Sequence, residues 1–291
     1  MRMRVWCRVL AAAGCVLTLV PLSGCAGPAV GTAGVPPAVG TAGVPPAVGT
    51  AGVPPAGGSV TVGPGADAVA DGRGRTASGL AVRHVGTLFH AGSDHFCSGG
   101  ILADAGADLV VTAAHCVWPA AGAAPYDDLE FAPAYGHGTG PYGRWKAARI
   151  TVDPRWTAAS DPDLDVAFVE LAPRDGRRAS DLVGTDRISF GPAAGGTIRL
   201  TGYPDGADDA TTCLGTPTRP SAGRLRVACT GYPAGTSGSP WLAGWDAGTG
   251  TGTVVGVIGG YQQGGDTADV SYSSYFGDDV RQLYLRATAP H

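Results

Sequence analysis

No acidic residue precedes Asp67 in this sequence, so its charge is unevenly distributed. The chain has 291 residues and a formal charge of −4. Removal of an N-terminal segment that contains Arg2, Arg4 and Arg8 changes this charge to −7 (−4 minus 3). An acidic domain lacks the basic patch with which proteins bind phosphate backbones. The net charge therefore argues against a nucleic-acid-binding module.

A hydrophobic run long enough to cross a bilayer is absent from the N-terminal region. The apolar stretch from Val9 to Pro21 is too short for a membrane span, and it follows the arginines of a basic n-region. This pattern predicts an export signal over residues 1–24. Leu22-Ser23-Gly24-Cys25 resembles the lipobox of bacterial lipoproteins, which predicts a lipid anchor on Cys25. The alternative is an ordinary signal peptide with a chance cysteine.

Metal-ligand spacings such as His-x3-His or Cys-x2-Cys are absent as well. His84, His90, His95 and His137 are scattered through polar or loop contexts, which is typical of surface histidines. We expect no metal site and no cofactor.

A nine-residue repeat occupies the segment that follows the predicted signal. Ala-Val-Gly-Thr-Ala-Gly-Val-Pro-Pro occurs three times between Ala29 and Pro55, with no charge and no aromatic residue. Such a composition cannot bury enough apolar surface to offset the entropy of ordering. Residues 25–74 are therefore predicted to be the anchor cysteine and a disordered tether, and residues 75–291 to be one domain.

Short β-branched segments separated by Gly, Pro, Asp and Ser turns fill the predicted domain. We expect strands at 85–89, 99–102, 109–112, 147–152, 166–171, 197–202, 224–228 and 253–258. One helix is predicted over Asp278 to Ala287, with Asp278 as its cap and Val280, Leu283 and Tyr284 on one face. Many short strands with a terminal helix indicate an all-β barrel or sandwich.

Four cysteines remain outside the signal and the lipid site, and an exported domain lies where disulfides persist. Pairing along the chain joins Cys97 to Cys116 and Cys213 to Cys229. Four cysteines permit three arrangements in principle.

Three segments in chain order carry residue types that cooperate in nucleophilic catalysis. They are Thr112-Ala113-Ala114-His115-Cys116, Asp165-Val166-Ala167-Phe168-Val169-Glu170-Leu171 and Gly235-Thr236-Ser237-Gly238-Ser239-Pro240. A serine hydroxyl is a poor nucleophile until an adjacent base takes its proton, and imidazole titrates near the working pH. A carboxylate on the far ring nitrogen would fix the tautomer.

These motifs resemble those of the chymotrypsin-like (trypsin-fold) serine peptidases over residues 80–287. The serine motif is closer to the bacterial glutamyl-endopeptidase-like branch. The resemblance implies two six-stranded antiparallel β-barrels with a C-terminal helix. It also implies a His115, Asp165 and Ser237 triad and an oxyanion hole made by the N–H groups of Gly235 and Ser237. The family pattern Asp-x-Ala selects Asp165 over Asp161 and Asp163.

The resemblance also locates the substrate-binding residues: Gly231, Tyr232, Gly259, Gly260 and Tyr261. Gly231 offers no carboxylate, which weakens a preference for Arg or Lys, although Asp266 or Asp269 could reach the pocket. The histidine of the glutamyl branch would align near Ile258, and its absence argues against Glu specificity. We expect a neutral or apolar substrate side chain.

Activation differs from the animal pattern at two points. Thr236 stands where digestive peptidases carry an aspartate that pairs with a freshly cut N-terminus. The segment from Arg75 to Ala81 also lacks an Ile-Val-Gly-Gly start. We therefore expect the chain to be active without cleavage near Arg75.

The predicted activity is that of a serine endopeptidase, and two other classes compete with it. A catalytically silent trypsin-fold binding lipoprotein would be expected to lack a triad member, and none is missing here. An α/β-hydrolase needs the chain order Ser, Asp, His, which this sequence reverses. We therefore expect a monomer that acts on protein or peptide substrates. It would lie on the outer face of the cell membrane, or be secreted if the tether is cut.

Overall fold

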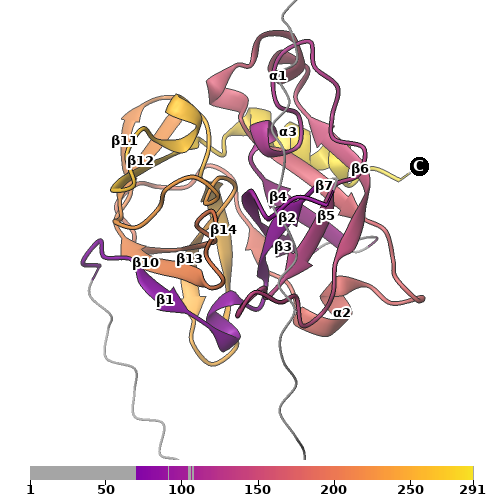
Figure 1. The fold of residues 1–291 in the computed structure, drawn as a ribbon. Coiled ribbons are helices and arrows are strands. Elements are labelled where there is room, and N and C mark those ends of the chain that lie inside the picture. The colour runs from indigo at the N-terminus through magenta and orange to yellow at the C-terminus, as the bar shows by residue number, and fades with distance from the viewer. Residues whose placement is uncertain (1–69, 91, 104–105, 107, 291) are drawn as a thin grey trace, which may run out of the picture. The chain divides into compact units, whose positions relative to one another are not determined.

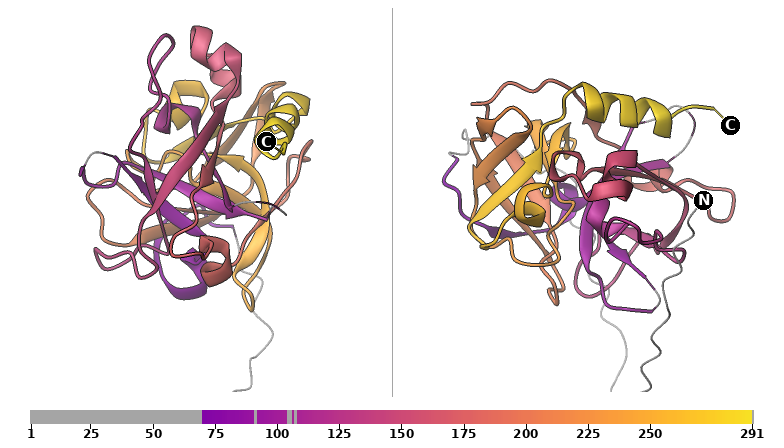
Figure 2. Two further views of the ribbon diagram at one scale, coloured as in Figure 1. Left: turned by 90° about the vertical axis from the view of Figure 1, so that its right-hand side faces the viewer. Right: turned by 90° about the horizontal axis from the view of Figure 1, so that it is seen from above.

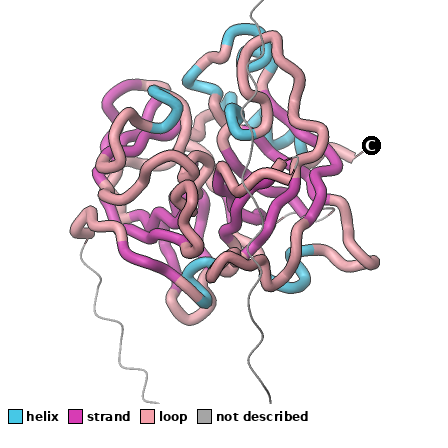
Figure 3. Tube along the Cα trace, in the orientation of Figure 1, coloured by secondary structure: helices cyan, strands magenta, loops and turns pink. Residues whose placement is uncertain are grey.

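The first half of the folded chain is a closed six-stranded β-barrel. A computed structural model describes residues 70–90, 92–103, 106 and 108–290. Neighbouring strands follow the order β2-β3-β4-β7-β6-β5, and every pair is antiparallel (Figures 1 and 3). The bounds are β2 Val85–Phe89, β3 Cys97–Leu102, β4 Asp108–Thr112, β5 Glu130–Pro133, β6 Trp145–Val152 and β7 Ala167–Leu171.

The second half contains two sheets. A six-stranded sheet has the order β1-β10-β9-β13-β14-β8, and a three-stranded sheet has the order β11-β12-β15. Their bounds are β1 Arg75–Ala77, β8 Arg187–Ile188, β9 Ile198–Gly202, β10 Ala210–Gly215, β11 Thr218–Ser221, β12 Arg224–Ala228, β13 Pro240–Asp246, β14 Thr251–Val257 and β15 Val270–Ser274. The predicted all-β fold is confirmed, with one closed barrel and further sheets.

Strands β4 and β7 have apolar centres, Leu109–Val111 and Ala167–Val169, because both of their faces are buried there. Successive side chains of a strand point to opposite faces. Val110 and Val169 point into the barrel core, whereas Val111 and Phe168 pack with Val254 of the second half. The two strands therefore hold the halves together, and His115 and Asp165 lie next to their ends.

Helices are few and short. The α-helices are α1 Pro154–Ala159, α2 Ala179–Val183 and α3 Asp278–Ala287, and the 3-10 turns are η1 Gly79–Val82, η2 Ala114–Cys116, η3 Pro162–Leu164 and η4 Tyr261–Gly264. α3 lies against β6 and β7 of the first barrel (Figure 2). In the described part of the chain, no helix has the length and apolarity that a membrane span requires.

The structure reproduces the predicted strands within two residues at each end, and the C-terminal helix has the predicted bounds. The predicted cap of that helix is wrong: Gly277 is the N-cap residue, and Asp278 lies in the first turn. There the carboxylate faces the positive end of the helix dipole without capping it. Val280 and Leu283 are buried, as their spacing predicted.

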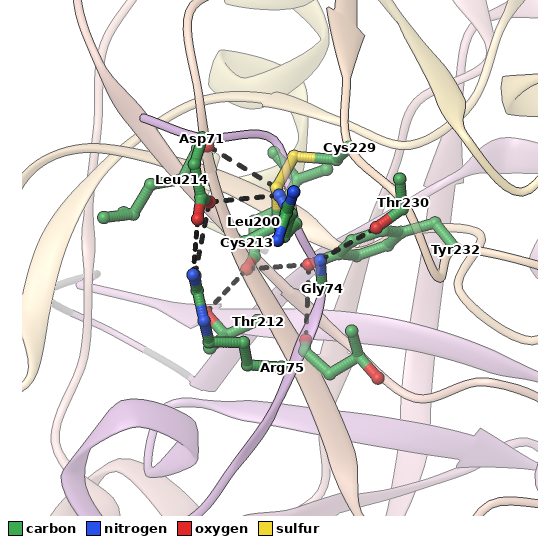
Figure 4. Close-up of a disulfide and its surroundings, with 12 residues drawn as sticks. Asp71, Gly74, Arg75, Leu200, Thr212, Cys213, Leu214, Cys229, Thr230 and Tyr232 are labelled. Atoms are coloured by element: carbon green, nitrogen blue, oxygen red, sulfur yellow. Dashed lines mark hydrogen bonds and ion pairs between the residues drawn. A yellow bond between two sulfur atoms is a disulfide. The ribbon is translucent and has the colours of Figure 1, made fainter. Parts of the chain in front are cut away.

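The end of the predicted tether lies against the second half of the domain. The N–H of Gly72 donates to Leu214 O at 3.1 Å, and its carbonyl accepts from the N–H of Thr230 at 2.8 Å. Gly74 N–H donates to Thr230 Oγ1, and Asp71 pairs with Arg75, beside the Cys213–Cys229 disulfide (Figure 4). The contacts of the domain thus begin before Arg75. The predicted signal, Cys25 and the repeat lie outside the described residues.

Candidate active site

His115 lies where β4 ends and the short turn η2 begins. Cys116 is disulfide-bonded to Cys97 of β3, which fixes this turn on the barrel. The ring Nδ1 of His115 lies 2.7 Å from Asp165 Oδ2, and the backbone N–H of His115 donates to Asp165 Oδ1 at 2.9 Å. One carboxylate therefore holds both the ring and the main chain of His115, and Nε2 is left for other chemistry.

Asp165 precedes β7 and is fully buried. Burial acts to raise the pKa of this carboxyl group, but the His115 charge, the ring hydrogen bond and the N–H groups of Gly260 and His115 outweigh it. The pKa of Asp165 is therefore below its ordinary value, and the group is ionised at neutral pH.

The two rival carboxylates lie elsewhere. Asp161 accepts a hydrogen bond from the N–H of Asp163 at 3.1 Å and caps η3, and the Asp163 side chain is exposed. Neither makes a contact with His115 in the described part of the chain. The geometry thus separates Asp165 from its neighbours by burial and by its bond to the imidazole.

Ser237 is half-buried in a turn that packs on the end of β4. Gly238 has a φ of +82°, and a Cβ there would collide with Ser98 O and Thr112 Oγ1. Its N–H donates to Ile258 O at 2.7 Å. Only glycine allows the serine turn to pack this closely against Thr112, which lies three residues before His115 in the chain.

A pocket of about 370 Å³ opens beside Ser237. One side is formed by the serine loop, with Pro233, Ala234 and Thr236, and another by Ile258 and the loop 262–268. Asp266 is the single charged residue among those that line it, and the Gln262 amide contacts its carboxylate. The site therefore combines a paired imidazole, a serine on a tight turn and an adjoining pocket of side-chain size.

The trypsin-like peptidase domain family matches residues 97–257, more than half of the chain. The chain belongs to the trypsin-like peptidases. Two solved structures are each 28% identical with a TM-score of 0.64: protease Anisep from Arthrobacter nicotinovorans, and a thermostable serine protease AL20 from an extremophilic microorganism. Each similarity covers 73% of this chain and 99% or 100% of the other.

A Glu endopeptidase is 17% identical, with a TM-score of 0.62 over 75% of this chain and 97% of that one, and it shows the shared fold alone. A comparison with curated protein sequences found no match. The peptidase fold and family are thus shown, while its place in the glutamyl-endopeptidase-like branch stays a prediction.

Only part of the predicted substrate-binding set reaches the peptidase's pocket. Tyr232 lines it, with its hydroxyl donating to Leu200 O at 3.0 Å. Gly231 is not among the lining residues, and Tyr261 packs edge-on against Tyr272 beneath the Arg224 guanidinium. Asp266 lines the pocket, as the sequence allowed, and Asp269 is not among the lining residues. The rest of the 262–268 loop was not predicted, although the Gly264-Gly265 pair after a strand marks it as a turn.

Gly259 and Gly260 use their main-chain groups within the peptidase itself. The N–H of Gly259 donates to Tyr272 O at 3.0 Å, and that of Gly260 donates to Asp165 Oδ2 at 2.8 Å. The carbonyl of Gly260 accepts from the N–H of Gln263 at 2.9 Å, so this segment orients Asp165 and is itself held by the turn that follows it.

The cysteines and histidines have separate partners. The structure joins Cys97 to Cys116 and Cys213 to Cys229, the pairing in chain order. The sulfurs near His115 are thus bonded to each other and offer no thiolate to a metal. The four scattered histidines contact different groups: His84 with Asp186, His90 with Tyr126, His95 with Ala207 O and His137 with Asp209. The surface interpretation is wrong for His84 and His95, because both are buried.

Proposed function

We propose that the protein is a serine endopeptidase in which Ser237 is the nucleophile, His115 the general base and Asp165 the group that orients the imidazole. The single observation that carries this proposal is the buried bond between Asp165 Oδ2 and His115 Nδ1 at 2.7 Å. It supports a tautomer in which Nδ1 bears the proton and Nε2 can accept one. Ser237, on its glycine-flanked turn at the mouth of the pocket, supplies the hydroxyl.

The proposed reaction proceeds through an acyl-enzyme. Ser237 Oγ attacks the scissile carbonyl carbon while His115 Nε2 takes the hydroxyl proton, and the N–H groups of Gly235 and Ser237 donate to the developing oxyanion. His115 then gives the proton to the leaving amine as the C–N bond breaks. A water molecule repeats the sequence on the ester and releases the acid and the free serine.

The pocket supports a preference against acidic side chains. A carboxylate of the substrate would lie near Asp266, and the described residues that line the pocket include no Lys, Arg or His to pair with it. We expect cleavage after uncharged or basic residues and none after Asp or Glu. A cleavage-site profile on a peptide library checks this, and preferred cleavage after Glu would contradict it.

The predicted export signal, the lipid on Cys25 and the tether belong to the same proposal. A peptidase on such a tether would act on protein or peptide substrates at the outer face of the cell membrane. Mass spectrometry of the membrane fraction should detect a lipidated N-terminal Cys25, and recovery of unmodified protein from the medium alone would favour an ordinary signal peptide.

Active-site labelling tests the proposed function directly. A fluorophosphonate probe should label the wild type and leave S237A unlabelled, because the probe requires an activated serine hydroxyl. The matched control is S239A, a neighbouring buried serine, which should keep its label. Absence of labelling in folded wild type would favour the silent binding lipoprotein.

A further inference from the structure

The carbonyl of Ala234 is held on the side away from the substrate. It accepts from the N–H of Asp205 at 2.7 Å. Gly235 has a φ of +88°, and a Cβ there would collide with the main chain of Tyr203 and Asp205. Because the peptide group is planar and trans, fixing the Ala234 carbonyl toward Asp205 directs the Gly235 N–H the opposite way. The orientation of this N–H is thus determined by contacts outside the pocket.

Ser98 of β3 bonds to the serine loop at two points. Its hydroxyl donates to Gly235 O at 3.1 Å and accepts from the N–H of Tyr203 at 2.9 Å. Its own N–H donates to Ser237 O at 2.7 Å. Ser98 is completely buried, so water cannot replace these bonds. Ser98 of the barrel therefore fixes the two peptide groups that flank the Thr236–Ser237 peptide, and that peptide carries the Ser237 N–H.

Thr236 closes the loop from within. The side chain is buried, and its hydroxyl donates to Pro233 O at 2.6 Å. A neutral hydroxyl bonded inside its own turn needs no ionic partner from elsewhere in the chain. Thr236 thus has a local role that is independent of any N-terminal amine.

The remaining N–H groups of the loop divide into two kinds. Those of Thr236, Gly238 and Ser239 donate to main-chain carbonyls. Those of Gly235 and Ser237 donate to no acceptor within the described part of the chain. The two unused donors are the pair expected at an oxyanion hole. The N–H groups of Asp205 and Ser239 hold the carbonyls of the same two peptide groups. The hydroxyls of Ser98 and Thr236 hold the peptide groups next to them.

We infer that the hydroxyls of Ser98 and Thr236 are positioning groups that preform the oxyanion hole of the uncleaved chain. This inference rests on the proposed serine peptidase activity. The pair does not touch the substrate's reacting atoms and acts through the peptides of Gly235 and Ser237. Loss of the Ser98 hydroxyl leaves Gly235 O and the Tyr203 N–H without this partner, and loss of the Thr236 hydroxyl leaves Pro233 O with only the longer bond from the Thr236 N–H, at 3.3 Å. Either loss lets the loop relax away from the geometry of the transition state.

The test compares S98A and T236V with a matched control, T87V. Thr87 lies opposite Ser98 in the barrel, is equally buried, and donates its hydroxyl to Cys97 O at 2.8 Å. It has no hydrogen bond to the serine loop among the described residues. Each full-length variant is assayed for kcat, KM and thermal unfolding. Each is also titrated with a peptide aldehyde, which forms an oxyanion on the serine, and with the matching peptide amide, which does not.

We expect S98A and T236V to lower kcat about 10- to 100-fold, with KM nearly unchanged. Aldehyde affinity should fall by a similar factor and amide affinity should not. T87V should lose thermal stability without these changes, and T236S should recover most of the T236V loss. If S98A does not fold, the comparison of T236V with T236S tests the inference.

The inference is overturned if both hydroxyl variants keep the kcat and aldehyde affinity of the wild type, or if T87V shows equal losses. A wild type that neither turns over substrate nor reacts with a fluorophosphonate would instead refute the proposed function.

Discussion

At the scale of single residues, Asp165 differs from two nearby carboxylates by its surroundings. It is fully buried and bonds to His115 and Gly260, whereas Asp161 caps a turn and Asp163 faces solvent. These contacts keep the pKa of Asp165 below its ordinary value even though burial acts to raise it. All three residues are aspartates, so their different surroundings decide which one can orient the imidazole.

The D165N variant should lower kcat by about four orders of magnitude at neutral pH, because an amide can hold the imidazole in the wrong tautomer. D163N is the matched control and should keep its activity. In the wild type Asp165 stays ionised through the mildly acidic range. Its contribution is present above the ordinary carboxyl pKa and is lost only as the pH falls through the lowered pKa. Steady-state kinetics on both variants check this, and equal losses would contradict it.

At the scale of secondary-structure elements, Asp153 joins two helices to a strand. It follows β6, accepts from the N–H of Arg155 at 2.9 Å as the N-cap of α1, and pairs with Arg155 at 3.0 Å. Arg286 of α3 pairs with the same carboxylate at 3.2 Å. A short helix and the C-terminal helix thus share one buried acceptor.

D153A should destabilise the peptidase by about 1–2 kcal/mol, through the lost cap and two partly exposed ion pairs. D153N keeps the cap oxygen and should lose less. Burial acts to raise the pKa of Asp153, but its bonds to Arg155 and Arg286 lower it overall. The stability that the charge of Asp153 contributes is therefore present above the ordinary carboxyl pKa. It disappears as the pH falls through the lowered pKa of the folded state. Denaturant unfolding at several pH values should show the wild type and D153N converging in acid.

At the scale of the whole domain, each end of the described chain packs on the opposite half. β1 pairs with β10 of the second half, and α3 packs on β6 and β7 of the first (Figures 1 and 2). The two halves are therefore tied by both ends as well as by the core around Val111 and Phe168. Unfolding of one half should expose the apolar residues that the other half packs against it, which predicts a single cooperative unfolding transition.

Cutting the purified chain after Arg75 should bring no gain in activity, because the serine loop holds itself without a new N-terminus. The cut detaches Gly72 and Gly74 from Leu214 and Thr230, so a lower unfolding temperature is expected. Activity and thermal unfolding before and after limited proteolysis check both expectations, with an R75Q chain as the uncut control. Activity that appears only after the cut would contradict the inference of a preformed site.

The sequence alone determined eight of the fifteen described strands, the C-terminal helix and the three motifs, because apolar periodicity and glycine-flanked turns are local properties. It did not predict β1, β5, β8, β10, β11, β13 or β15. Only the tertiary structure selected Asp165 by contact, placed Asp266 in the pocket and brought Ser98 against Gly235 across 137 residues of chain. Such contacts leave no local signature: Ser98 reads as one more small residue beside a cysteine. Its role arises because the barrel and the serine loop pack together, and packing is a property of the folded chain.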